Sequence, residues 1–118
     1  YDIKDFGTNS EESVDYPDIA HALSKSINDG IIKTGILICG SGIGVSIVAN
    51  KYDNVRAALC WKKDIAMFSR MHNNANVLCL PARFIEDSDA IETLQVFMKT
   101  EFEGGRHERR VEKINKKL

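Results

Sequence analysis

The chain has 118 residues, of which 43% are hydrophobic and 28% are charged, and its formal net charge is −1. This length and composition are typical of a single globular domain with a sizeable buried core. The nearly neutral charge argues against nucleic acid as the main partner. No apolar run approaches the roughly 20 residues of a membrane-spanning helix.

The three cysteines, Cys39, Cys60 and Cys79, each lie in or at the end of an apolar run. An odd number of cysteines in such positions argues against a disulfide framework. The sequence contains no Cys-x-x-Cys pair, which argues against a zinc site. We therefore expect reduced thiols, no metal and a cytoplasmic location.

Segments with the apolar pattern of a strand alternate along the chain with segments that have the apolar pattern of a helix. We expect strands over residues 3–6, 36–39, 55–60 and 77–80, and helices over residues 16–29, 43–50, 61–71 and 87–102. The unbroken apolar run at 36–39 is typical of a strand buried on both faces. Alternating strands and helices favour an α/β fold with a parallel sheet, in which ligands bind beyond the carboxyl ends of the strands.

The end of the chain differs from this α/β core. Gly104-Gly105 predicts a hinge, so we expect a core domain over residues 1–103 and a basic C-terminal helix over residues 104–118. Val111, Ile114 and Leu118 form a narrow apolar stripe in this helix. A helix with so little apolar surface is marginally stable alone. We expect it to protrude and to pack on a neighbouring subunit.

A glycine-rich loop, Gly40-Ser41-Gly42-Ile43-Gly44, follows the apolar run at 36–39. A dinucleotide fingerprint would need glycine at Val45, and the Gly-Lys-Ser/Thr of a phosphate-binding Walker loop is absent. Free backbone N–H groups in such a loop suit an anion. The alternative is a tight turn that needs glycine only for its backbone angles.

Cys39 is the candidate nucleophile or base, because it stands directly before this loop and the helix that follows. A helix N-terminus stabilises a nearby thiolate. The alternative is a small buried hydrophobic residue, which is what most free cysteines are. Cys60 and Cys79 lack such a loop, and we expect both in the core.

Basic side chains occur at three further places. His72 lies at the polar end of the helix over 61–71, where capping of the helix is the alternative to a catalytic role. Arg106 and Arg110 are four residues apart and share one helix face, so they suit a dianion, the alternative being a solvated basic face. Arg83 follows a strand. His21 and His107 lie on stretches that we expect to face solvent.

Taken together, these segments resemble one family over essentially the whole chain. The motifs are ILICGSGIGVSIVANK, VRAALC, MHNNANVL, LPAR, GGRHERRVEKI and, near the start, DFGTNSEESVDYPD. They are similar to ribose-5-phosphate isomerase B and to the related galactose-6-phosphate isomerase subunits. The resemblance implies a Rossmann-like, three-layer αβα domain with a five-stranded parallel sheet. It also implies a homodimer or homotetramer with active sites at the subunit interface.

This resemblance implies conversion of aldose phosphates to ketose phosphates without a metal or cofactor. Cys39 would be the base that moves a proton between C2 and C1 of the sugar. Ser41 and the loop backbone would stabilise the enediolate, and His72 would assist opening of the furanose ring. The substrate-binding glycines would be Gly40, Gly42 and Gly44.

The resemblance also assigns the remaining binding residues. Tyr16 would line the pocket and Asn73 would contact substrate oxygens. Arg106 and Arg110 would hold the phosphate, and Arg83 would contribute from the neighbouring side of the interface.

The sequence departs from the family at its start, where a first strand, an Asp-His loop and a helix are missing before Tyr1. We expect that the chain is trimmed relative to the working protein. The leading function is interconversion of ribose 5-phosphate and ribulose 5-phosphate. Two alternatives remain: isomerisation of a hexose 6-phosphate such as allose or galactose 6-phosphate, and sugar-phosphate binding without catalysis.

Overall fold

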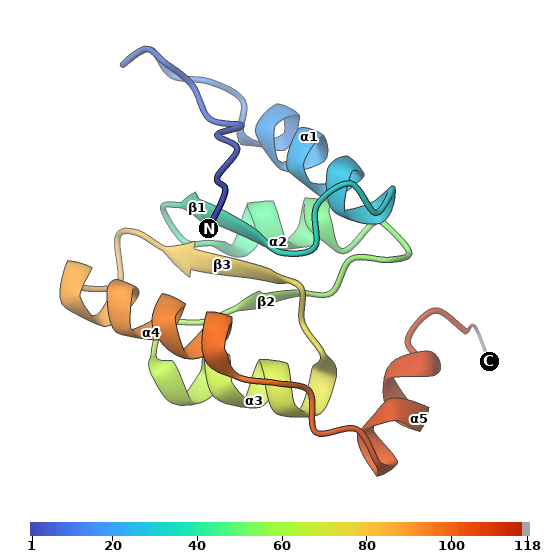
Figure 1. The fold of residues 1–118 in the computed structure, drawn as a ribbon. Coiled ribbons are helices and arrows are strands. Elements are labelled where there is room, and N and C mark those ends of the chain that lie inside the picture. Colours follow the sequence, from blue (N-terminus) through green and yellow to red (C-terminus); the bar gives the residue numbers. More distant parts are fainter. Residues whose placement is uncertain (117–118) are drawn as a thin grey trace.

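The computed structural model describes residues 1–116, which form one α/β domain (Figure 1). Three strands and five helices follow one another along these residues. Their bounds are α1 Tyr16–Asn28, β1 Gly35–Cys39, α2 Ile43–Ala49, β2 Ala57–Leu59, α3 Lys63–Asn73, β3 Val77–Pro81, α4 Asp87–Lys99 and α5 Arg106–Glu112.

The three strands form a parallel sheet in the order β1-β3-β2. Gly35 and Ala57 both pair with Val77, so all three strands begin at the same end of the sheet. Cys39 pairs with Pro81 at the opposite end, where the strands finish. Helices α1 and α2 cover one face of the sheet, and α3 and α4 cover the other (Figure 1). The three-layer αβα arrangement is therefore confirmed, with three strands in the described residues where the resemblance implied five.

The core has two halves because neighbouring residues of a strand point to opposite faces of the sheet. Leu37, Val77 and Cys79 pack with α1 and α2, whereas Leu78 and Leu80 pack on the side of α3 and α4. Every residue of β3 is buried, as expected for the central strand.

Two predictions about strands are wrong. Residues 3–6 form no strand: the Asp5 side chain accepts the backbone N–H of Gly7 at 2.7 Å, and this local turn takes the place of sheet pairing. The strand β1 is not buried on both faces, since Ile36 and Ile38 are 37% and 62% exposed. The cause is that β1 is an edge strand of the sheet. On the face where Ile36 and Ile38 lie, helix α4 contacts the central strand β3.

The helices are where the sequence predicts them, with shifted ends. Pro17 lies in the first turn of α1, where its missing N–H costs nothing. Asn74 takes a left-handed conformation (φ 48°) and ends α3, two residues later than expected. Helix α4 ends at Lys99 and the extended Thr100 follows, so residues 100–102 are not helical.

Helix α5 is short and lies beside the C-terminal end of α3 (Figure 1). Of the predicted apolar stripe, Val111 is half-buried and Ile114 is 57% exposed, while Leu118 is outside the described residues. Docking of this helix on a neighbouring subunit stays a prediction. Among residues 1–116, no helix has the length and apolar character needed to cross a membrane.

Candidate active site

Cys39 ends β1 and is half-buried at the start of the glycine loop. The backbone N–H of Gly42 donates to its Sγ atom at 3.1 Å, and the N–H of Ile43 donates to Ser41 Oγ at 3.2 Å. These are two of the four N–H groups that a helix start leaves without a helical acceptor. The other two, those of Gly44 and Val45, have no acceptor in the described part of the chain. Cys39 thus lies beside free donors suited to a developing negative charge.

Two of the loop glycines are required by close packing. Gly42 has φ +73°, and a Cβ atom there would collide with the Leu59 side chain and lie 3.2 Å from the Leu80 carbonyl carbon. A Cβ atom on Gly44 would lie only 2.5 Å from Cε1 of Tyr16. The Tyr16 ring therefore lies directly on the loop, and its expected role in lining a substrate pocket stays a prediction.

Arg83 lies against the same loop of its own chain. Its backbone N–H donates to the Gly40 carbonyl at 3.0 Å, and a Cβ atom on Gly40 would be 3.1 Å from Arg83 Nε. The Ala82 N–H donates to the Cys39 carbonyl at 2.8 Å, which ties the end of β3 to the end of β1. The structure thus brings Arg83 to the Cys39 loop within one chain, and its contribution to phosphate binding across an interface stays a prediction.

The other two thiols differ from Cys39 in their surroundings. Cys60 and Cys79 are both completely buried, which confirms their expected place in the core. Burial raises the pKa of Cys60 to about 11 and that of Cys79 to about 12. Both remain neutral and unreactive at physiological pH, since the thiolate is the reactive form.

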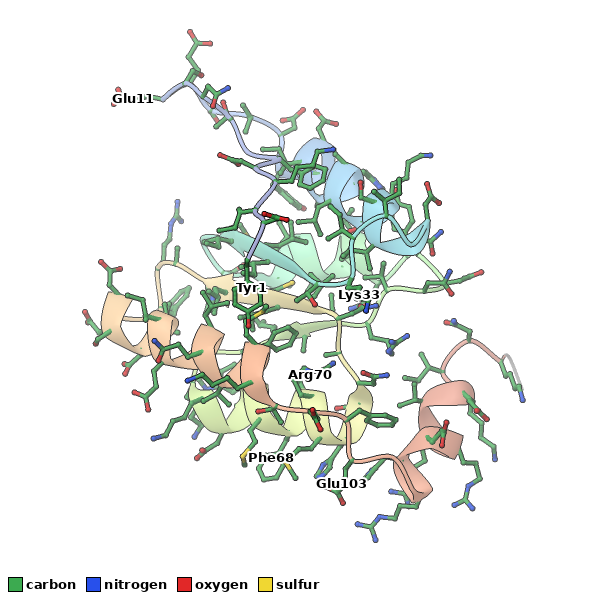
Figure 2. All side chains as sticks on the ribbon, in the orientation of Figure 1. Tyr1, Glu11, Lys33, Phe68, Arg70 and Glu103 are labelled. Carbon is green, nitrogen blue, oxygen red and sulfur yellow. The ribbon has the colours of Figure 1, made fainter. Side chains whose placement is uncertain are left out.

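The second group of predicted residues lies at the C-terminal end of α3 and in α5. His72 is half-buried and Asn73 is exposed at the end of α3, and Arg106 and Arg110 are exposed in α5. The His72 ring packs against Phe68 (centroids 5.1 Å apart) and stacks on His107 (4.3 Å apart, planes at 14°). The labels of Phe68 and Glu103 mark this end of the molecule in Figure 2.

His107 is a residue that the sequence reasoning missed. We expected it to face solvent, but it is only 6% exposed, because α5 presses it onto His72. Burial lowers the pKa of His107, the charge on His72 lowers it further, and Glu103 acts in the opposite direction. His107 is therefore neutral at pH 7. Its spacing of four residues from the half-buried Val111 is the sequence signal for an inward-facing position.

His72, Glu103 and His107 are the cluster in residues 1–116 that comes closest to a metal site, with one ligand atom of each within 4.8 Å of the others. An imidazole binds a metal through a lone pair in the plane of its ring. The two rings lie in nearly parallel planes, so their lone pairs do not converge on one ion. This geometry fits a stacked histidine pair rather than a metal site.

The two groups lie at opposite ends of the sheet. Because α3 connects the parallel neighbours β2 and β3, it runs back from the carboxyl ends of the strands to their amino ends. Cys39 therefore lies at the carboxyl ends of the strands and His72 at their amino ends. In Figure 1, the β3 arrowhead marks the carboxyl ends and α5 lies toward the amino ends. The five residues of β3 alone span about 13 Å, so one small sugar cannot contact both groups of a single chain.

The family model for ribose/galactose isomerases matches residues 1–114. The chain belongs to this family. It is 40% identical over 113 residues to ribose-5-phosphate isomerase B of Escherichia coli, a match that covers 96% of this chain and 76% of the relative.

Two solved structures extend this similarity to the fold. Ribose 5-phosphate isomerase B from Thermotoga maritima is 51% identical with a TM-score of 0.93, and the match covers 97% of this chain and 79% of that one. The enzyme from Mycoplasma genitalium, solved with bound ribulose 5-phosphate, is 46% identical with a TM-score of 0.88, over 92% and 72% of the two chains.

Proposed function

We propose that the protein is a cofactor-independent aldose–ketose isomerase that interconverts ribose 5-phosphate and ribulose 5-phosphate in the cytoplasm. The observation that carries the proposal is the environment of Cys39. Its sulfur accepts a backbone N–H at 3.1 Å beside two further N–H groups without acceptors, and it is the one thiol that is not completely buried. Membership in the family and the names of its relatives support the same reaction.

The proposed chemistry is a proton transfer between neighbouring carbons. The Cys39 thiolate removes the proton from C2 of the open-chain aldose, the C–H electrons form the C1–C2 double bond, and O1 takes the negative charge. The thiol then returns the proton to C1, while a proton moves from O2 to O1, which gives the ketose. Ser41 and the loop N–H groups stabilise the enediolate as preorganised donors.

We propose that each working site combines the Cys39 end of one copy with the His72 end of another, in a homodimer or homotetramer. The position of the two groups at opposite ends of the sheet supports this arrangement. In such a site, Tyr16 and Arg83 act beside Cys39. His72, Asn73, Arg106 and Arg110 come from the second copy, with His72 assisting ring opening and the arginines holding the phosphate.

His107 takes a supporting place in this proposal. The His107 ring stacks on the His72 ring and Phe68 packs against the same imidazole, so the imidazole of His72 has little freedom to rotate. We assign His107 as a positioning residue for His72.

The first test compares two sugars and two cysteine variants. We expect turnover of ribose 5-phosphate, loss of turnover by about 10²-fold or more in Cys39→Ala, and nearly unchanged sugar-phosphate affinity by calorimetry. Cys60→Ala is the matched control, since it removes a thiol from the core and should keep activity. Faster turnover of allose or galactose 6-phosphate would assign a hexose substrate, as the family description allows. Binding without turnover in the unmodified protein would favour a binding module.

The second test addresses the phosphate. Arg110→Ala should raise KM by about tenfold or more with a smaller change in kcat, because a charged hydrogen bond to the remote phosphate is lost. Arg109→Ala is the matched control on a different face of α5. Equal KM values for the two variants would place Arg110 among ordinary surface residues.

A further inference from the structure

A cavity lies at the end of the sheet opposite Cys39. Its volume is about 320 Å³, and its wall is formed where each strand begins. None of the residues proposed for the isomerase site lines it. The main contributors are Lys33 and Thr34 before β1, Arg56 before β2, Asn76 before β3, and Arg70 from α3.

The wall of this cavity carries three positive charges and no carboxylate. Arg56 Nε donates to the Asn74 carbonyl at 2.9 Å, and Arg70 Nε donates to the Thr100 carbonyl at 3.0 Å. These neutral acceptors orient both guanidinium groups without neutralising them. Neither arginine forms an ion pair within residues 1–116, and the two terminal amino groups of Arg56 have no acceptor there.

The two guanidinium groups are close enough to disfavour one another. Burial lowers the pKa of Arg56, the charge of Arg70 lowers it further, and burial also lowers the pKa of Arg70. Arginine nevertheless stays protonated in proteins. The cavity therefore holds like charges that an anion of two negative charges would balance.

We propose that this cavity binds the phosphoryl group of a small phosphorylated metabolite, at a site separate from the isomerase site. The guanidinium fork of Arg56, whose terminal amino groups have no acceptor in residues 1–116, matches phosphate oxygens in geometry, and three cations favour a dianion over a monocarboxylate. The volume is at the lower limit of about 300–1,000 Å³ for ligand sites, so it suits a phosphate with a short carbon chain. The proposal does not depend on the isomerase reaction.

The test is a titration with inorganic phosphate, glycerol 3-phosphate and acetate, followed by the NMR signals of backbone amides. Saturable shifts at Thr34, Ala75 and Asn76 are expected with both phosphates. Tighter binding of glycerol 3-phosphate would assign an organic phosphate, and equal binding would assign free phosphate. Signals of the Arg106 and Arg110 amides report the proposed phosphate-binding residues of the isomerase site separately in the same spectra. No saturable shift at the three amides, or equal shifts with acetate, would overturn the proposal.

Reversing the charge of Lys33, an exposed residue in the wall of the cavity, makes the test specific to this site. Lys33 is exposed and forms no ion pair in the described residues, so Lys33→Glu should leave the fold intact. We expect it to weaken phosphate binding at the three amides by at least about fivefold. Lys62→Glu makes the same change in net charge at the other end of the sheet and should have little effect. Equal weakening by both variants would show a general charge effect and refute a local site.

Discussion

Two inactive variants of this protein should restore activity when they are mixed. Cys39→Ala removes the proposed base at the carboxyl ends of the strands, and His72→Asn removes the proposed ring-opening group at the other end. If each site takes one end from each of two copies, a mixed pair contains one site in which both residues are intact. A site contained within one chain would stay defective in every mixture.

The expected fraction of restored activity follows from the number of sites in which both residues are intact. In an equal mixture with random assembly, about half of the sites receive their Cys39 end from a chain in which Cys39 is intact. Independently, about half receive their His72 end from a chain in which His72 is intact. About one quarter of the sites are therefore intact, and activity should reach about one quarter of that of the unmodified protein at equal concentration. The same fraction applies to a tetramer built from such pairs.

The assay is ribose 5-phosphate turnover after the two variants are unfolded and refolded together, with native mass spectrometry to establish that mixed assemblies form. A mixture of Cys39→Ala with Ser41→Ala is the matched control. Both residues are at the same end, so every site keeps one defect and no activity should return. Mixed assemblies of Cys39→Ala and His72→Asn without activity would refute the two-copy site.

Three further results are expected. Iodoacetamide should modify the native protein once, at Cys39, because the raised pKa values and burial of Cys60 and Cys79 keep them unreactive; peptide mass mapping that finds Cys60 or Cys79 modified first would contradict this. The free energy of unfolding should decrease as the pH falls below about 6.5, because the unfolded state protonates His107 before the folded state does. His107→Gln should make this decrease smaller in urea titrations at pH 7.5 and 5, and an unchanged pH dependence would exclude His107 as a cause. Leu78→Ala empties a fully buried position in the central strand, so it should cost about 2–5 kcal/mol and lower Tm by roughly 10–20 °C, whereas a change of only a few degrees in calorimetry would show that the core is not packed as described.

The sequence predicted the order of the helices and strands better than their burial and their pairing in the sheet. The apolar run at 36–39 identified a strand, but such a run does not show whether the strand is central or at an edge. The exposure of Ile36 and Ile38 follows from the order β1-β3-β2, which depends on pairing between distant segments. Residues 3–6 show the converse: a suitable strand pattern forms no strand when a local side-chain bond competes and no neighbouring strand pairs with it.

The candidate site was predictable where it is local in sequence. The contacts among Cys39, Ser41 and Gly42 follow from the turn between a strand and a helix. The stacking of His107 on His72 was not predictable, because it joins segments 35 residues apart and the flanking charges suggested exposure. Only the direction of α3 along the sheet shows that Cys39 and His72 are far apart within one chain.

Hydrogen exchange at C2 of ribose 5-phosphate tests the central claim most directly. In deuterated water, the unmodified protein should replace this hydrogen with deuterium as the base exchanges its proton with solvent, and proton NMR follows the loss of the signal. Cys39→Ala should bind the sugar phosphate without exchanging the C2 hydrogen or forming ribulose 5-phosphate. Exchange by Cys39→Ala at the rate of the unmodified protein would contradict the assignment of Cys39 as the base.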